Sequence, residues 1–99
     1  MITNLNEQNF EKETATGLKL VDFSASWCTF CQMLKPELEA LDKIWIGVVD
    51  GDDSPNLAQK FNVTGYPTMV LLKNGKEVER LVGYCSKEEI LSKVIRHLH

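Results

Sequence analysis

The sequence is short of cysteine and has no long apolar run, and each shortage excludes a class of protein. Three cysteines in 99 residues are too few, and odd in number, for the disulfide framework of a small secreted protein. The longest strictly apolar runs, such as residues 69–72, have four residues or fewer, whereas a membrane-spanning helix needs roughly 20. A chain of this length can instead bury one ordinary hydrophobic core, so we expect a single domain that folds without cross-links.

Basic charge is also scarce. Eleven lysines and arginines against fourteen acidic residues give a net charge of −3. This balance argues against the basic face that nucleic acids require and against attachment to an anionic membrane surface. The first basic residue is Lys12, and no apolar stretch of the kind found in signal peptides follows Met1. We therefore expect a cytoplasmic protein that has neither nucleic acid nor membrane as a partner.

Hydrophobic periodicity in the first half of the chain predicts alternating strands and helices. A short strand at residues 2–3 precedes a weakly amphipathic helix over 4–16. Dense apolar residues predict a buried strand at 18–25. Leucines at the i, i+4, i+7 spacing predict a helix over 28–43, in which Pro36 predicts a kink.

Local turn and cap signals organise the second half. The elements expected there are a strand at 44–49, a helix at 54–61, a hairpin of strands at 69–73 and 77–82, and a last helix. Ser54-Pro55 is an N-cap followed by proline at the first helical position, the Asn-Gly pair at 74–75 predicts a type I′ turn, and residues 86–89 form a capping box. The order β-α-β-α-β-α-β-β-α predicts an α/β fold, with a mostly parallel central sheet, helices on both faces and the hairpin at one edge.

Two cysteines, Cys28 and Cys31, stand two residues apart where the buried strand gives way to a helix. Cys28 falls at the helix N-terminus, where unpaired N–H groups and the helix dipole favour a thiolate. Cys31 lies one turn further along, and we expect it to be the more buried of the two. The spacing brings both sulfurs within disulfide reach, so Cys28 can attack a substrate disulfide and Cys31 can resolve the product.

Other interpretations of this pair remain open. A pair of this kind is also half of a zinc or iron–sulfur site, but the only other soft ligands here are Cys85, His97 and His99. We therefore expect no metal. Two inert core thiols are a second alternative, although Trp27 and the helix start favour a reactive site.

Two further features have structural explanations. Cys85 precedes the N-cap Ser86, which makes Cys85 and Ile90 a hydrophobic-staple pair, with a regulatory third thiol as the alternative. The aspartates at 50, 52 and 53 lack the spacing of an EF-hand, so cap and turn chemistry explains them better than a cation.

Several motifs together make the chain resemble thioredoxins over nearly its whole length. They are Val21-Asp22-Phe23, Trp27-Cys28-x-x-Cys31, Pro36, Gly65-Tyr66-Pro67-Thr68, Lys73-Asn74-Gly75 and Val82-Gly83. The resemblance implies a thioredoxin fold as one domain over residues 1–99, with a central mixed sheet flanked by helices on both faces. It also implies a cis peptide bond before Pro67, which places that turn against the cysteine pair.

The resemblance further implies a protein-disulfide reductase that works by dithiol–disulfide exchange. Its substrates would be protein disulfides, and a reductase such as thioredoxin reductase would recycle it. No dissociable cofactor is expected beyond the redox-active disulfide Cys28–Cys31, and we expect a monomer. The alternatives are a more oxidising or glutathione-linked oxidoreductase and a non-catalytic binding module on the same fold.

Residues around the pair are candidates for substrate contact: Trp27, Phe30, Tyr66, Pro67 and Gly83. Phe30 is informative because a side chain at the second helical position should point outward, and an exposed aromatic beside a nucleophile suggests substrate contact. Core packing is the alternative interpretation of these residues.

Asp22 lies in the densest apolar strand, where a carboxyl group buried on both faces is costly and its pKa should rise. The resemblance gives Asp22 the role of proton donor and acceptor for Cys31.

The chain departs from the family pattern at Thr29-Phe30, where Gly and Pro are usual, at Ser24, where an aromatic is usual, and at Val48, where a lysine is usual. The segment 36–52 is also shorter than in most members. Val48 offers no charge to offset the burial of Asp22, so we expect Asp22 to protonate closer to neutral pH than in relatives that keep the lysine.

Overall fold

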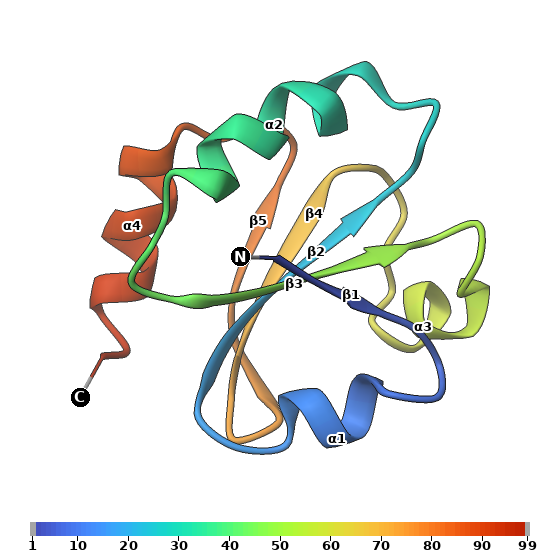
Figure 1. Cartoon of the computed structure of the whole chain (residues 1–99), viewed down its shortest axis with the longest axis horizontal. Coiled ribbons are helices and arrows are strands. Elements are labelled where there is room, and N and C mark those ends of the chain that lie inside the picture. The colour runs from blue at the N-terminus through green and yellow to red at the C-terminus, as the bar shows by residue number, and fades with distance from the viewer. Residues whose placement is uncertain (1, 99) are drawn as a thin grey trace.

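The computed structural model describes residues 2–98 and confirms the predicted order of elements (Figure 1). The elements are β1 (Ile2–Leu5), α1 (Phe10–Thr14), β2 (Leu18–Ser24), α2 (Thr29–Glu39), β3 (Trp45–Asp50), α3 (Pro55–Lys60), β4 (Thr68–Lys73), β5 (Lys76–Val82) and α4 (Lys87–Ile95). Within this described part, no helix combines the length and apolar character that crossing a bilayer requires.

The five strands form one mixed sheet in the order β1-β3-β2-β4-β5. β1 and β2 both run parallel to β3, whereas β4 is antiparallel to β2 and to β5. The hairpin therefore supplies the antiparallel edge, as predicted. In the centre of the sheet Asp22 of β2 is paired with Val48 on one side and Met69 on the other.

Helices cover both faces of the sheet: α2 and α4 lie on one face, and α1 and α3 on the other (Figure 1). Successive side chains of β2 alternate between these faces because a strand has a period of two. Leu20 packs in the core under α2 and α4, and Val21 and Phe23 pack in the core under α1 and α3. Asp22 consequently faces α2, the helix that carries Cys31.

Local signals set several element boundaries as predicted. Ser54 is the N-cap of α3 with Pro55 at its start, although the Ser54 side chain makes no capping hydrogen bond. The capping box of α4 is complete, with the Glu89 N–H donating to Ser86 Oγ over 3.2 Å. Asn74 and Gly75 both have positive φ (51° and 83°) in the two-residue hairpin loop.

Two predicted helices were too long. The predicted helix over 4–16 is wrong in its first half: β1 continues to Leu5, which pairs with Val49, and α1 starts only at Phe10. Between them Asn6 Oδ1 accepts hydrogen bonds from the N–H groups of Gln8 and Asn9, which makes a turn.

The helix predicted over 28–43 ends at Glu39. Its last turn tightens, with the Leu41 N–H donating to the Leu38 carbonyl over 3.0 Å. Leu41 nevertheless stays buried in the core beside the helix, which explains why its spacing extended the predicted helix. The short connection that follows leads into β3 at Trp45.

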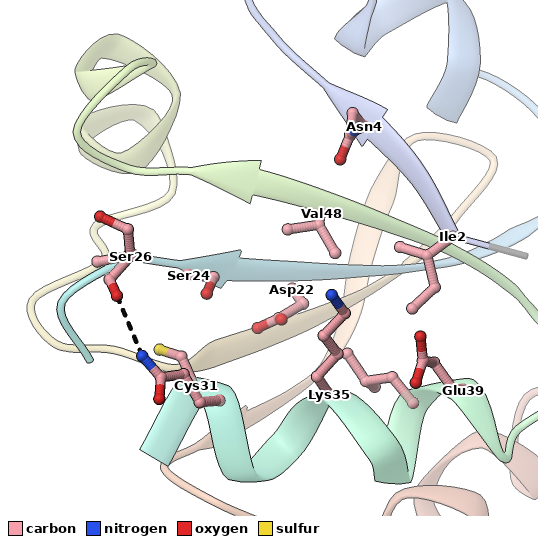
Figure 2. Close-up of a pocket in the computed structure, with 12 residues that line it drawn as sticks. Ile2, Asn4, Asp22, Ser24, Ser26, Cys31, Lys35, Glu39 and Val48 are labelled. Carbon is pink, nitrogen blue, oxygen red and sulfur yellow. Dashed lines mark hydrogen bonds between the residues drawn. The ribbon is translucent and has the colours of Figure 1, made fainter. Parts of the chain in front are cut away.

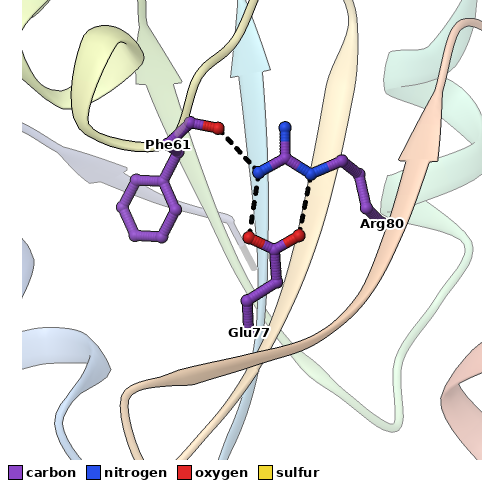
Figure 3. A network of polar contacts seen from close by, with 3 residues as sticks. All are labelled: Phe61, Glu77 and Arg80. Atoms are coloured by element: carbon purple, nitrogen blue, oxygen red, sulfur yellow. Dashed lines mark hydrogen bonds and ion pairs between the residues drawn. The ribbon is translucent and has the colours of Figure 1, made fainter.

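A forked ion pair ties the far edge of the sheet to α3 (Figure 3). The Arg80 guanidinium donates to both carboxylate oxygens of Glu77, over 2.8 and 2.9 Å, and to the Phe61 carbonyl over 2.6 Å. Phe61 is the C-cap of α3. The contact therefore anchors the end of α3, from which the chain continues to the turn at Pro67.

Candidate active site

Cys28 is the N-cap of α2, the position predicted for it. Its backbone is extended (φ −92°, ψ 114°), and its Sγ accepts a hydrogen bond from the Cys31 N–H over 3.2 Å. The first N–H groups of a helix have no partner within the helix and carry partial positive charge. The Cys28 sulfur thus occupies a place where negative charge is favoured, which is what a nucleophilic thiol requires.

Cys31 is the third residue of α2, and all three cysteines are free thiols. The prediction that Cys31 is more buried than Cys28 is wrong, because both residues are 6% exposed. The turn before Pro67 covers Cys28: Tyr66 packs on the cluster of the two cysteines and Ala25. Burial raises the pKa of Cys31 to about 11, and the neighbouring Cys28 adds to the rise, while hydrogen bonds from the Ser24 side chain and the Ala25 backbone oppose it.

The peptide bond between Tyr66 and Pro67 is cis, as the family resemblance implied. The Tyr66 carbonyl lies 3.5 Å from Cys28 Sγ, which donates a hydrogen bond to it. Gly83, with φ of 88°, donates its N–H to the Pro67 carbonyl over 2.8 Å. The structure therefore brings Tyr66, Pro67 and Gly83 together beside Cys28.

An exposed apolar rim surrounds the cysteines. Trp27 is 68% exposed and Phe30 57%, so the outward position expected for Phe30 is confirmed. Trp27 is fixed by a 2.9 Å hydrogen bond from its Nε1 to Asp52 and by an edge-on contact with Tyr66. Sequence reasoning did not assign Val82, the last residue of β5, which is 70% exposed next to Gly83; its place at the end of the hairpin, just before that glycine, was the available signal.

Asp22 is buried as predicted, with only 3% of its surface exposed. Its Oδ1 has no hydrogen-bond partner among residues 2–98. Desolvation raises the pKa of the Asp22 carboxyl to about 7. A carboxyl group that titrates near neutral pH can both accept and donate a proton under physiological conditions.

A cavity of about 630 Å³ opens between β2 and α2, and both Asp22 and Cys31 line it (Figure 2). Lys35 of α2 extends into this cavity toward Val48, a placement that sequence reasoning missed (Figure 2). Lys19 is not available to Asp22, because its ammonium lies 4.6 Å from the centre of the Trp45 ring.

The alternative metal ligands are placed elsewhere. Cys85 is buried beneath α4 in the same core cluster as Ile90, as the staple prediction requires. His97 Nε2 lies 3.0 Å from Glu79 Oε2, and His99 lies outside the described residues. Across residues 2–98, no three histidine, cysteine or acidic side chains gather as metal ligands.

The three aspartates at positions 50, 52 and 53 form a turn, as predicted. Asp50 Oδ1 accepts hydrogen bonds from the N–H groups of Asp52 and Asp53, over 2.9 and 3.4 Å. These bonds shape the turn that leads from β3 to α3.

Comparison with known proteins agrees with this geometry. The family model described as Thioredoxin matches residues 1–96. The thioredoxins of Chlamydia muridarum and Chlamydia trachomatis serovar D are 43% and 42% identical to the chain, over 98% of it and 99% of their own lengths. Among solved structures, a mutant thioredoxin from Halobacterium salinarum superposes with a TM-score of 0.91 at 26% identity, covering 99% of this chain and 91% of that one.

Proposed function

The chain belongs to the thioredoxin family and is a disulfide oxidoreductase, and from this premise we propose that Cys28 attacks protein disulfides and Cys31 resolves the intermediate. The observation that carries this assignment is the hydrogen bond from the Cys31 N–H to Cys28 Sγ at the start of α2. This hydrogen bond points the positive end of a backbone dipole at Cys28 Sγ, so negative charge is favoured on the Cys28 sulfur.

The proposed reaction has two exchanges. The Cys28 thiolate attacks one sulfur of the substrate disulfide, a new S–S bond forms, and the other substrate sulfur leaves with the electron pair and takes up a proton. The Cys31 thiolate then attacks Cys28 Sγ, which forms the Cys28–Cys31 disulfide and releases the second substrate thiol. Two electrons pass from the cysteine pair to the substrate.

The second exchange requires Cys31 to lose a proton that its high pKa holds tightly. We assign the acceptor role to Asp22, whose carboxyl lines the same cavity and titrates near neutral pH. In the opposite direction the protonated carboxyl returns the proton to Cys31. Asp22 thus serves both directions of exchange.

The exposed rim would bind the polypeptide on either side of the substrate disulfide. Trp27 and Phe30 offer apolar contact, and the turn of Tyr66 and Pro67 with Gly83 offers backbone groups next to Cys28. An apolar rim around a nucleophile suits an unfolded or exposed protein segment better than a small polar disulfide.

We further propose the setting in which the protein works. The redox-active pair carries the electrons itself, so no dissociable cofactor is needed, and a reductase such as thioredoxin reductase would regenerate the dithiol. Reduced thiols persist in the cytoplasm, which is the compartment we assign. The protein would act there as a monomer in cell redox homeostasis and electron transport to its substrates.

A turbidity assay with insulin and dithiothreitol tests the assignment. We expect the wild-type protein to accelerate precipitation of the insulin chains and the Cys28→Ser variant to lose that acceleration. Cys85→Ser is the matched control and should keep it, because Cys85 is buried away from the pair. An active Cys28→Ser variant, or an inactive Cys85→Ser variant that is still folded, would contradict the proposal.

A further inference from the structure

We propose that Gly51 is a positioning residue of the active site, an assignment that rests on the proposed attack by Cys28. The space left by its missing side chain seats the Tyr66 ring, and the seated ring covers the Cys28 sulfur. Gly51 is buried and follows directly after β3. Because β3 runs parallel to β2, with Asp50 paired with Ser24, Gly51 lies at the end of the sheet where β2 leads to Cys28 (Figure 1).

A side chain at position 51 would have no room. A methyl group on the Gly51 Cα would overlap the Tyr66 hydroxyl oxygen and would lie 2.5 Å from Cζ and 2.7 Å from Cε1 of the same ring. Carbon atoms in van der Waals contact are about 3.5–4.0 Å apart, so the rigid ring as a whole stands in the way. The Gly51 backbone does not itself require glycine, because the described glycines with positive φ are Gly17, Gly75 and Gly83. Glycine is therefore needed here for space.

The Gly51 backbone is held on both sides. Its N–H donates a hydrogen bond to the Ser24 carbonyl over 2.9 Å, and Asp50 before it is the last residue of β3. The N–H of Asp52 after it donates to Asp50 Oδ1 over 2.9 Å. The Tyr66 ring, by contrast, belongs to a residue that is only partly buried and can turn toward solvent. An added methyl group should therefore displace the ring rather than the loop.

The seated ring is part of the cover over the nucleophile. Tyr66 packs on the cluster formed by Ala25, Cys28 and Cys31. Its ring stands edge-on to Trp27, with the ring centroids 5.9 Å apart, and its carbonyl lies 3.5 Å from Cys28 Sγ. Under this cover Cys28 is only 6% exposed, although it is the residue that must reach a substrate disulfide.

The cover should make Cys28 selective between classes of disulfide. A protein segment can contact the exposed rings of Trp27 and Phe30 as it approaches. Those contacts offset the displacement of the Tyr66 ring, because binding energy gained away from the reacting atoms can drive a rearrangement at them. A small reagent makes no such contacts and meets the covered sulfur. The Gly51 slot thus favours protein disulfides over small ones.

Four variants of the full chain test the slot: Gly51→Ala, Tyr66→Val, the double variant, and Gly65→Ala as the matched control. A methyl group at Gly65, next to Tyr66, would meet no heavy atom within 4 Å. The readouts are the rate of Cys28 alkylation by iodoacetamide, followed by peptide mass spectrometry, and the rate of insulin reduction. We expect Gly51→Ala to speed alkylation on the order of threefold or more, because the displaced ring exposes the sulfur. The ratio of insulin reduction to alkylation should fall by the same factor.

Tyr66→Val should speed alkylation in the same way, and adding Gly51→Ala to it should change nothing further, because the ring is already gone. Gly65→Ala should match the wild type. If Gly51→Ala alone does not fold, the double variant should fold, since it lacks the conflicting ring.

Three results would overturn the role of Gly51. They are wild-type alkylation and selectivity in a folded Gly51→Ala, additive effects of the two substitutions, or a double variant that does not fold. An equal change in Gly65→Ala would also overturn it, because the effect would then belong to the turn and not to the slot. A wild-type protein whose Cys28 is not alkylated and that reduces no insulin would instead contradict the proposed function.

Discussion

The backbone N–H of Cys31 donates a hydrogen bond to the sulfur of Cys28 over 3.2 Å, and this bond fixes the Cys28 side chain against the first turn of α2. The arrangement makes the two thiols unequal although they are equally buried. Cys28 Sγ accepts a hydrogen bond from an N–H group of the helix. Cys31 has a pKa of about 11, so another group must remove its proton before it can attack. The asymmetry of attack and resolution follows from this one contact.

Selective alkylation should reveal that inequality. Burial raises the pKa of both Cys31 and Cys85, with Glu89 adding to the effect at Cys85. At pH 7 both therefore remain protonated and react slowly, because the thiolate is the nucleophile. Limited treatment of the reduced protein with iodoacetamide should label Cys28 first, as read by peptide mass spectrometry. Preferential labelling of Cys85 would contradict the assignment and support a regulatory third thiol.

Replacing Asp22 by Asn should stabilise the fold above neutral pH. The folded pKa of about 7 exceeds the ordinary value of 3.8, so between these values the folded state binds a proton that the unfolded state has lost. The wild-type free energy of unfolding therefore falls as pH rises through this window, by an amount on the order of 2–4 kcal/mol. An Asn side chain resembles the neutral carboxylic acid and does not ionise, so the variant keeps its free energy of unfolding as pH rises.

Chemical denaturation at several pH values measures the difference. The advantage of Asp22→Asn should be largest at pH 8, shrink as pH falls from about 7 and vanish below about 4. The same variant should resolve mixed disulfides more slowly, because it lacks the proton acceptor. A stability difference that is constant over pH would mean that Asp22 is not a desolvated acid.

A lysine at position 48 should lower the pKa of Asp22. Val48 is the partner of Asp22 in the sheet and lines the same cavity, so an ammonium there would favour the carboxylate. The expected fall is about one unit or more, measured by NMR titration of the carboxyl carbon in reduced protein.

Reductase activity should then persist to lower pH in Val48→Lys, since Asp22 remains a base there. Val48→Met is the matched control, because it has similar length and no charge, and it should leave the titration of Asp22 unchanged. An equal shift in both variants would attribute the effect to packing rather than to charge.

The parts of this fold that the sequence predicts well depend on neighbouring residues. The capping box at Ser86 and the hairpin loop at Asn74-Gly75 each form within four residues, so their signals are complete in the local sequence. The position of the cysteine pair at the start of α2 was also predictable, because the local sequence contains both the pair and the beginning of the helix. The burial of Asp22 was also predictable, because it needs only the apolar strand around it.

The parts that were missed depend on distant contacts. Leu5 belongs to β1 because it pairs with Val49, a residue far along the chain, and local periodicity cannot report that pairing. Cys28 is as buried as Cys31 because the Tyr66 turn covers it. Lys35 enters the cavity beside Asp22 only once α2 is laid against the sheet (Figure 2).

Phe30 should affect the reduction potential of the cysteine pair through its backbone N–H and the reduction of protein substrates through its ring. Its N–H is among the first helical donors beside Cys28, and its ring is 57% exposed at the rim. Replacing Thr29-Phe30 by Gly-Pro removes the donor, so the reduced form loses stabilisation and the pair should become more reducing. Phe30→Ala keeps the donor and removes the ring, and should weaken protein-substrate reduction while leaving the potential in place. If both replacements leave both properties unchanged, Phe30 tunes neither.

The reduction potential of the Cys28–Cys31 couple tests most directly whether this protein is a reductase. It is measured by equilibrating the wild-type protein with glutathione buffers of known ratio and counting the oxidised fraction by alkylation and mass spectrometry. A reductase that works on protein disulfides should have a potential below about −220 mV, so that the reduced pair passes electrons to protein disulfides and a glutathione buffer at that poise leaves the pair mostly oxidised. A potential near about −120 to −180 mV, at which the same buffer would keep the pair mostly reduced, would contradict the account and identify an oxidant or isomerase instead.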